Sequence, residues 1–179
     1  GRGPYLRTGD LGALENDELF VTGRLKDLVI IHGRNHYPHD IEHTVAETHE
    51  ALRADNGAAF AINHGGQEKL VVVQEVERQH RVELDVEAVA RQVREAVARE
   101  HEISLHAVAF IKPGSLPKTS SGKTQRGACE RQFMEGELKL VGQWRAEGEG
   151  SGGRVEPVEP EGRFEDQSVD ELKDWVLRW

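Results

Sequence analysis

The sequence predicts an α+β fold in which helices pack on a small mixed β-sheet. Two observations carry this prediction. Stretches rich in β-forming residues alternate with stretches of helical spacing along the chain. Their order is hairpin, β-rich run, helix, hairpin, long helix, strand, loop, helix, which is typical of one compact unit. The region from about residue 25 to 140 is long enough to bury a hydrophobic core.

The first elements are predicted between residues 11 and 46. Two apolar runs flank the polar stretch Glu15–Glu18, so a hairpin is expected there. A β-rich run, RLKDLVIIHGRN, follows and is interrupted at Gly33. A helix should begin near Pro38. Its apolar positions recur at helical spacing, at Ile41, Val45 and either Thr48 or His49.

The later elements include the clearest helix of the chain. AAFAIN and KLVVVQEV flank HGGQE and predict a second hairpin. Asp85 can cap the long helix that follows. One face of that helix carries an apolar stripe of Val86, Val89, Val93 and Val97. AVAFIK is predicted to be a strand and TQRGACERQFMEG a short closing helix.

Composition excludes several classes of function. The net charge of -9 argues against a general nucleic-acid binder, which would carry a basic face. No apolar run approaches the ~20 residues of a membrane helix. The single cysteine, Cys129, rules out an internal disulfide and fits a reducing compartment. We therefore expect a cytoplasmic protein that does not bind membranes.

The character of the chain changes after about Trp144. Residues 144–167 are rich in Gly, Glu and Pro, which predicts a flexible linker. Residues 168–179 resume helical spacing and are expected to begin a further, truncated domain. The first residues, GRGPYLRTGD, have the character of mid-domain sequence, so we expect a fragment.

The stretch PKTSSGKTQR, residues 117–126, ends like a phosphate-binding P-loop. That motif needs a glycine five positions before the Gly-Lys pair, so that backbone N–H groups can wrap the phosphates. Pro117 occupies this position and has no N–H to donate. The P-loop interpretation is therefore rejected. A solvated loop with incidental lysines is the alternative to a functional lysine.

Three stretches in order resemble the last core motifs of the adenylate-forming superfamily of acyl-CoA synthetases, adenylation domains and luciferases. They are YLRTGD at 5–10, GRLKDLVIIHG at 23–33 and PKTSSGK at 117–123. GRNHYPHDIE most resembles fatty acyl-AMP ligases, which activate fatty acids with ATP and pass them to acyl carrier proteins. The resemblance implies the tail of an N-terminal adenylating domain at 1–24 and a C-terminal cap subdomain at 25–143. The domain that follows could then be a carrier protein.

The resemblance also implies roles for individual residues. Asp10 would accept hydrogen bonds from the ribose hydroxyls of ATP or AMP, Arg24 would contact the ribose or phosphate side, and Lys26 would be the hinge. Without the resemblance, these would be a turn aspartate, a surface ion pair and a solvated lysine. Lys123 would be the catalytic lysine. Mg²⁺ would be bound mainly by the N-terminal domain.

Elementary electrostatics explains why this chemistry needs a lysine. Bringing a carboxylate to within 4 Å of a phosphate oxyanion costs about 4 kcal/mol per unit pair at an effective dielectric constant near 20. The Lys123 ammonium would offset this repulsion. Because it lies on a small, polar and pliable loop, it could be brought to the reacting groups and then withdrawn.

Several alternatives stay open. An acyl-CoA ligase or an amino-acid adenylation domain would carry the same motifs, although Ile30 replaces a lysine found in many superfamily members. A non-catalytic module that binds a carrier protein is a second alternative, and the fragment alone is expected to be inactive. His39 and His43 have the spacing of helical metal ligands, but without an HExxH pattern we assign no metal site.

Overall fold

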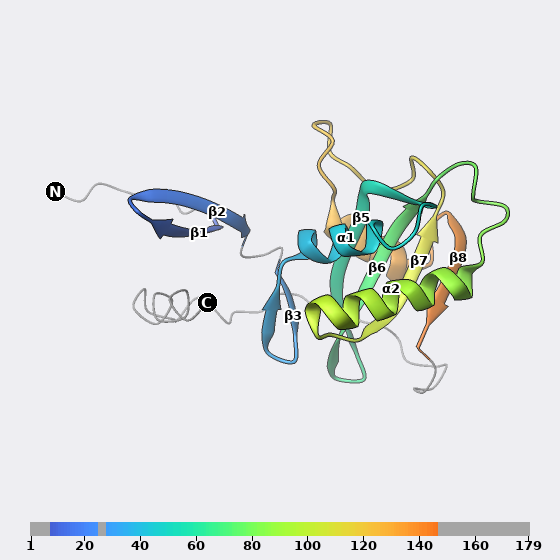
Figure 1. Cartoon of the computed structure of the whole chain (residues 1–179), viewed down its shortest axis with the longest axis horizontal. Coiled ribbons are helices and arrows are strands. Elements are labelled where there is room, and N and C mark those ends of the chain that lie inside the picture. Colours follow the sequence, from blue (N-terminus) through green and yellow to red (C-terminus); the bar gives the residue numbers. More distant parts are fainter. Residues whose placement is uncertain (1–7, 25–27, 147–179) are drawn as a thin grey trace. The chain divides into compact units, whose positions relative to one another are not determined.

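The computed structural model describes residues 8–24 and 28–146 (Figure 1). The described residues divide into two compact units, residues 8–24 and residues 28–146. Within the described residues, no helix is long and apolar enough to cross a membrane.

The first unit contains an antiparallel hairpin of β1 (Asp10–Glu15) and β2 (Glu18–Arg24). Both turn residues have positive φ, 51° at Asn16 and 65° at Asp17, as a two-residue hairpin turn of the primed type requires. The hairpin predicted around Glu15–Glu18 is therefore confirmed.

The second unit begins with another small hairpin and a helix. β3 (Val29–Ile31) pairs antiparallel with β4 (Arg34–His36), and the chain reverses between them at Gly33, with φ of 76°. The interrupted β-rich run is thus two short strands. Helix α1 (Pro38–Ala46) follows, with Pro38 in its first turn, where a missing N–H costs nothing.

A mixed four-stranded sheet forms the centre of the second unit, in the order β5-β6-β7-β8. Its strands are β5 (Leu52–His64), β6 (Gln67–Val76), β7 (Leu105–Ile111) and β8 (Leu140–Arg145). β6 and β7 run parallel because the helix α2 (Val86–His101) carries the chain back between them, whereas the outer pairs are antiparallel. The predicted α+β class with a small mixed sheet is confirmed.

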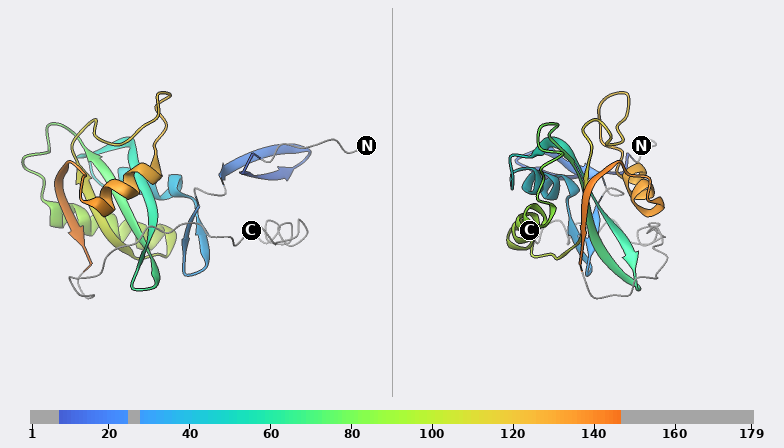
Figure 2. Two further views of the ribbon diagram at one scale, coloured as in Figure 1. Left: turned by 180° about the vertical axis from the view of Figure 1, so that it is seen from behind. Right: turned by 90° about the vertical axis from the view of Figure 1, so that its right-hand side faces the viewer.

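Helices cover both faces of this sheet, as the right-hand view of Figure 2 shows. α1 and α2 lie on one face and α3 (Arg126–Glu135) on the other. Side chains alternate between faces along a strand, so Val72 joins the core under α1 and α2 while Val71 and Val73 join the core under α3. The same alternation fixes the strand register.

Local signals that the sequence carried are also present. The Asp85 side chain accepts a hydrogen bond from the Ala88 backbone N–H at 3.0 Å, which confirms the predicted helix cap. Of the predicted stripe, Val89, Val93 and Val97 are buried.

One strand was not predicted. β8 includes Trp144 and Arg145, which the sequence analysis assigned to a linker starting at residue 144. The pairing of β8 with β7 and the contact of the Arg94 guanidinium with the Trp144 ring, 4.2 Å from its centroid, hold these residues in the sheet. The remaining predictions for 147–167 and 168–179 lie outside the described residues.

Candidate active site

The loop of residues 117–125 joins β7 to α3 and projects from the second unit (Figure 1). Its two arms hydrogen-bond to each other. The Gln125 N–H donates to the Pro117 carbonyl at 2.9 Å, and the Thr119 N–H donates to the Lys123 carbonyl at 2.8 Å. Lys118 and Thr124 form an antiparallel bridge between these bonds. The loop is therefore a narrow, internally bonded hairpin.

Lys123 lies at the exposed end of this loop. Gly122 supplies the positive φ of 82° that the reversal needs, and its N–H donates to the Thr119 carbonyl at 2.9 Å. The Lys123 N–H donates to Thr119 Oγ1 at 3.1 Å. These N–H groups are used within the turn, so they cannot wrap a phosphate as a P-loop does.

The Lys123 side chain is exposed, as its predicted role requires. Across residues 8–24 and 28–146, its ammonium makes no hydrogen bond or ion pair. A positive group in this state can approach an anion without first breaking a contact.

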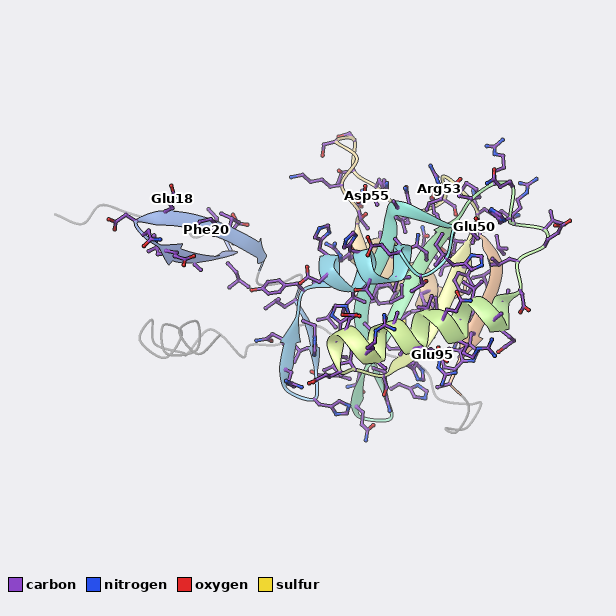
Figure 3. The ribbon with its side chains drawn as sticks, viewed as in Figure 1. Glu18, Phe20, Glu50, Arg53, Asp55 and Glu95 are labelled. Carbon is purple, nitrogen blue, oxygen red and sulfur yellow. The ribbon has the colours of Figure 1, made fainter. Side chains whose placement is uncertain are left out.

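The other lysine of the loop has a different environment. The Lys118 ammonium donates to Asn56 Oδ1 at 2.8 Å and to the Asp55 carbonyl at 3.2 Å. Asp55 lies near the N-terminal end of β5, beside the base of the projecting loop (Figure 3). Lys118 thus ties the loop to β5. Its ammonium is held by this contact, whereas that of Lys123 is not held by any described residue.

A buried carboxylate holds the chain just before the loop. Glu75, on β6, is 1% exposed, and its Oε1 accepts a hydrogen bond from the Leu116 N–H at 2.9 Å. Its other oxygen accepts from Arg53 Nη1 at 2.6 Å, and Figure 3 shows Arg53 on β5. The sequence analysis missed this group. Its one signal was the polar pair Gln74-Glu75, which interrupts the apolar run from Leu70 to Val76.

A second carboxylate holds the chain just after the loop. Arg126, the first residue of α3, donates from Nε to Glu42 Oε1 at 2.7 Å and from Nη2 to Glu42 Oε2 at 2.6 Å. This paired geometry is the strongest form of a guanidinium–carboxylate contact. Glu42 Oε1 also accepts from the Ala59 N–H at 2.9 Å. Nothing in the sequence joined α1 to α3 in this way.

Cys129 lies on the buried face of α3 and is not a candidate nucleophile. Burial raises the pKa of its thiol to about 12; the Glu42 carboxylate adds to the rise and the Arg126 guanidinium opposes it. The thiol is therefore protonated at neutral pH.

The predicted nucleotide-binding residues belong to the first unit. Asp10 is the first residue of β1 and is paired in register with Arg24, the last residue of β2, so the two backbones lie side by side. Asp10 is exposed. The side chain of Arg24 and the whole of Lys26 lie outside the described residues. Lys123 belongs to the other unit.

No group of three or more His, Cys, Asp or Glu residues in the described part of the chain is arranged to hold a metal ion. His39 and His43 are four residues apart on α1, but His43 contacts Glu47 instead, at 3.4 Å.

The family comparison covers most of the second unit. A family model described as "Disco-interacting protein 2-like, AMP domain" matches residues 26–143. This range includes α1, the four-stranded sheet as far as β8, and the loop that carries Lys123.

Individual relatives are similar over a longer stretch. The medium-chain-fatty-acid–[acyl-carrier-protein] ligase JamA of Moorena producens is 55% identical over 146 residues, which are 82% of this chain and 24% of JamA. The long-chain-fatty-acid–AMP ligase FadD26 of Mycobacterium tuberculosis is 40% identical over 143 residues, 78% of this chain and 24% of FadD26. The chain thus spans about a quarter of the length of these curated relatives.

Among solved structures, a fatty acyl-adenylate ligase of Legionella pneumophila in complex with acyl adenylate and pyrophosphate is similar. The TM-score is 0.52 at 38% sequence identity, and the match covers 81% of this chain and 25% of that one.

Proposed function

Since the chain belongs to the Disco-interacting protein 2-like AMP-domain family, we propose that it is the C-terminal cap of a fatty acyl-AMP ligase. The whole enzyme would use ATP to convert a fatty acid to acyl-AMP and pyrophosphate. It would then pass the acyl group to the phosphopantetheine thiol of an acyl carrier protein, in lipid or polyketide/peptide assembly. The observation that carries this proposal is Lys123, an exposed lysine without an anionic partner among the described residues, on a loop built to hold it outward.

Lys123 would act in the first half of the reaction. There the fatty acid carboxylate must approach the α-phosphate of ATP, and two anions repel each other. An ammonium placed between them lowers this repulsion and follows the charge that moves onto the phosphoryl oxygens in the transition state. The cap would deliver Lys123 for this step and withdraw it afterwards, turning about a hinge at Lys26.

The nucleotide would be held chiefly by the rest of the enzyme. Residues 1–24 would end the large N-terminal domain, with Asp10 accepting from the ribose hydroxyls and Arg24 near the ribose or phosphate. A carboxylate with two acceptor oxygens suits a vicinal diol. We assign Mg²⁺ to none of the described residues and expect it on the N-terminal domain.

The carrier protein is the favoured acceptor because JamA, at 55% identity, is named as an acyl-carrier-protein ligase. Residues beyond 146 would form a linker to a further domain, for example the carrier itself. We place the enzyme in the cytoplasm, where a single free cysteine stays reduced.

The role of Lys123 can be tested in the full-length ligase. Lys123→Ala should slow pyrophosphate release by about 10²-fold or more, since it removes the charge that stabilises the transition state. Lys139→Ala removes another exposed lysine, outside the loop, and serves as the matched control. Unchanged pyrophosphate release in Lys123→Ala would refute the assignment.

The acceptor is tested separately. The full-length enzyme is given fatty acid and ATP with either holo carrier protein or free coenzyme A, and the thioester is identified by mass spectrometry. Thioester on the carrier protein alone supports the proposal, whereas acyl-CoA as the main product would show an acyl-CoA ligase. The present chain alone should release no pyrophosphate.

A further inference from the structure

We propose that Glu42 and Glu75 are positioning residues for Lys123, because each holds one end of the loop that carries it. The inference rests on the proposed function of Lys123. It adds two residues that do not reach the substrate and that act through the backbone N–H of Leu116 and the side chain of Arg126.

Glu75 holds the entrance of the loop. It lies on the interior strand β6, and the two-residue alternation of that strand places it on the face covered by α3, with Val71 and Val73. An ionised carboxylate in such a position is costly unless it is paired and hydrogen-bonded. Glu75 satisfies both conditions, with Arg53 at 2.6 Å and the Leu116 N–H at 2.9 Å.

The identity of this residue is informative. Replacing a buried ion pair by apolar side chains is often neutral or stabilising, so stability alone does not explain a glutamate here. An apolar side chain, however, could not accept the hydrogen bond that the Leu116 N–H donates to Glu75. That bond fixes the chain one residue before Pro117, where the arms of the loop begin to pair.

Glu42 holds the exit of the loop. Its side chain is 12% exposed, and its two oxygens accept hydrogen bonds from one edge of the Arg126 guanidinium, three residues after Lys123. Glu42 is itself fixed, because it sits on α1 and accepts from the Ala59 N–H of β5. The start of α3 is thereby tied to a strand and to a helix on the opposite face of the sheet.

Together the two carboxylates fix the chain just before the loop, at Leu116, and just after it, at the start of α3. The pairing of its arms then transmits this position to Lys123, through the bond between the Thr119 N–H and the Lys123 carbonyl. Misplacing a reacting group by about 1 Å can cost about 10²-fold in rate. Loosening either end should therefore slow the step that needs Lys123.

The test compares the two half-reactions in the full-length ligase. Pyrophosphate release reports the first. Thioester formation from synthetic acyl-AMP and holo carrier protein reports the second, in which no triphosphate is present for Lys123 to neutralise. A positioning role predicts a loss in the first alone, whereas a general loss of folding lowers both.

The variants differ in what they leave behind. Glu75→Ala removes the acceptor for Leu116 and should slow pyrophosphate release about 10-fold, while Glu75→Gln keeps an acceptor oxygen and should stay within about 3-fold of wild type. Glu42→Gln keeps an oxygen for Ala59 but loses the charge facing Arg126, and should cost about 5-fold. Glu102→Gln breaks the exposed Arg34–Glu102 pair of 3.0 Å and is the matched control, with an expected change below about 2-fold.

A double-mutant cycle shows whether the effects pass through Lys123. In a Lys123→Ala background, Glu75→Ala and Glu42→Gln should slow pyrophosphate release no further, because the group that they position is gone. If Glu75→Ala and Glu42→Gln slow pyrophosphate release by the same factors in the Lys123→Ala background as in wild type, the inference is wrong. Equal losses of rate in both half-reactions, or no loss in either, would also overturn it. If Glu75→Ala does not fold, Glu42→Gln decides by the same criteria.

The two proposals fail in different ways. If Lys123→Ala leaves pyrophosphate release unchanged, the proposed function of Lys123 is wrong. If Lys123→Ala is slow while Glu75→Ala and Glu42→Gln match wild type, only the positioning roles are wrong.

Discussion

The chemistry of single residues here depends on burial more than on residue type. Cys129 is a thiol whose pKa of about 12 leaves almost no thiolate at pH 8. We expect a disulfide reagent such as DTNB to label it at least 10²-fold more slowly in the native protein than in denaturant, since only the thiolate reacts. The chain has one cysteine, so the absorbance change has one source. Rapid labelling of native protein at pH 8 would show that this thiol is accessible.

At the same scale, the sequence was informative about exposed groups and silent about buried polar ones. Asp85 was found because its neighbours in the chain define a helix start. Glu75 was not, because its partners Arg53 and Leu116 lie 22 and 41 residues away. A polar residue in an apolar strand signals that a partner exists, but it does not identify the partner.

Among the elements, β8 shows how tertiary contacts create structure that local pattern does not predict. Its side chains are half-buried or exposed and it contains a glycine, so neither alternation nor β-propensity is strong. The strand forms because β7 offers it a pairing edge, and because Trp144 finds Arg94 on α2. Sequence periodicity contains neither contact.

The glycine of β8 is required by the packing of α2. A methyl group at Gly142 would overlap the side chain of Val86 in the first turn of that helix. Gly142→Ala should therefore lower the free energy of unfolding by about 1–3 kcal/mol, as overpacked cores do. Urea denaturation followed by circular dichroism measures this. Val86→Ala in the same chain should restore part of the loss, and a double variant less stable than either single one would contradict this account.

For the molecule as a whole, two histidines make folding sensitive to acid. Burial lowers the pKa of His36 from 6.5, and the neighbouring His101 and Arg34 lower it further. Burial also lowers the pKa of His101, although Asp40 and Glu100 oppose this change. The unfolded state then binds more protons below pH 6.5 than the native state does. Stability should therefore fall as the pH drops through 6.5 and should be unaffected by these groups above it.

This dependence can be separated from that of the carboxylates. Urea midpoints are compared at pH 7.5 and 5.5 for wild type and for His101→Gln, which replaces the titrating ring whose Nε2 lies 2.8 Å from Thr44 Oγ1 by a neutral amide. The variant should lose less stability on acidification. Equal losses in the two proteins would mean that His101 does not contribute.

The α+β architecture, the hairpins β1–β2 and β5–β6, and the long capped helix followed from spacing and turn residues, because those signals are local. The assignment of Lys123 needed the resemblance of three motifs, since a lysine in a polar loop has no distinctive pattern of its own. The fixation of that loop by Glu42 and Glu75 needed coordinates, because it joins α1, β6 and α3 across the sheet.

The late position of β8 in the chain has a practical consequence for anyone who wishes to isolate the cap. A fragment that ends before Leu140 would lack β8, and the backbone N–H and C=O groups on that edge of β7 would be unpaired. Such an open edge can pair with a strand of another molecule and cause aggregation. An isolated piece that extends to Ala146, whose N–H donates to the His106 carbonyl at 2.9 Å, keeps β8 paired with β7, and we expect it to stay monomeric.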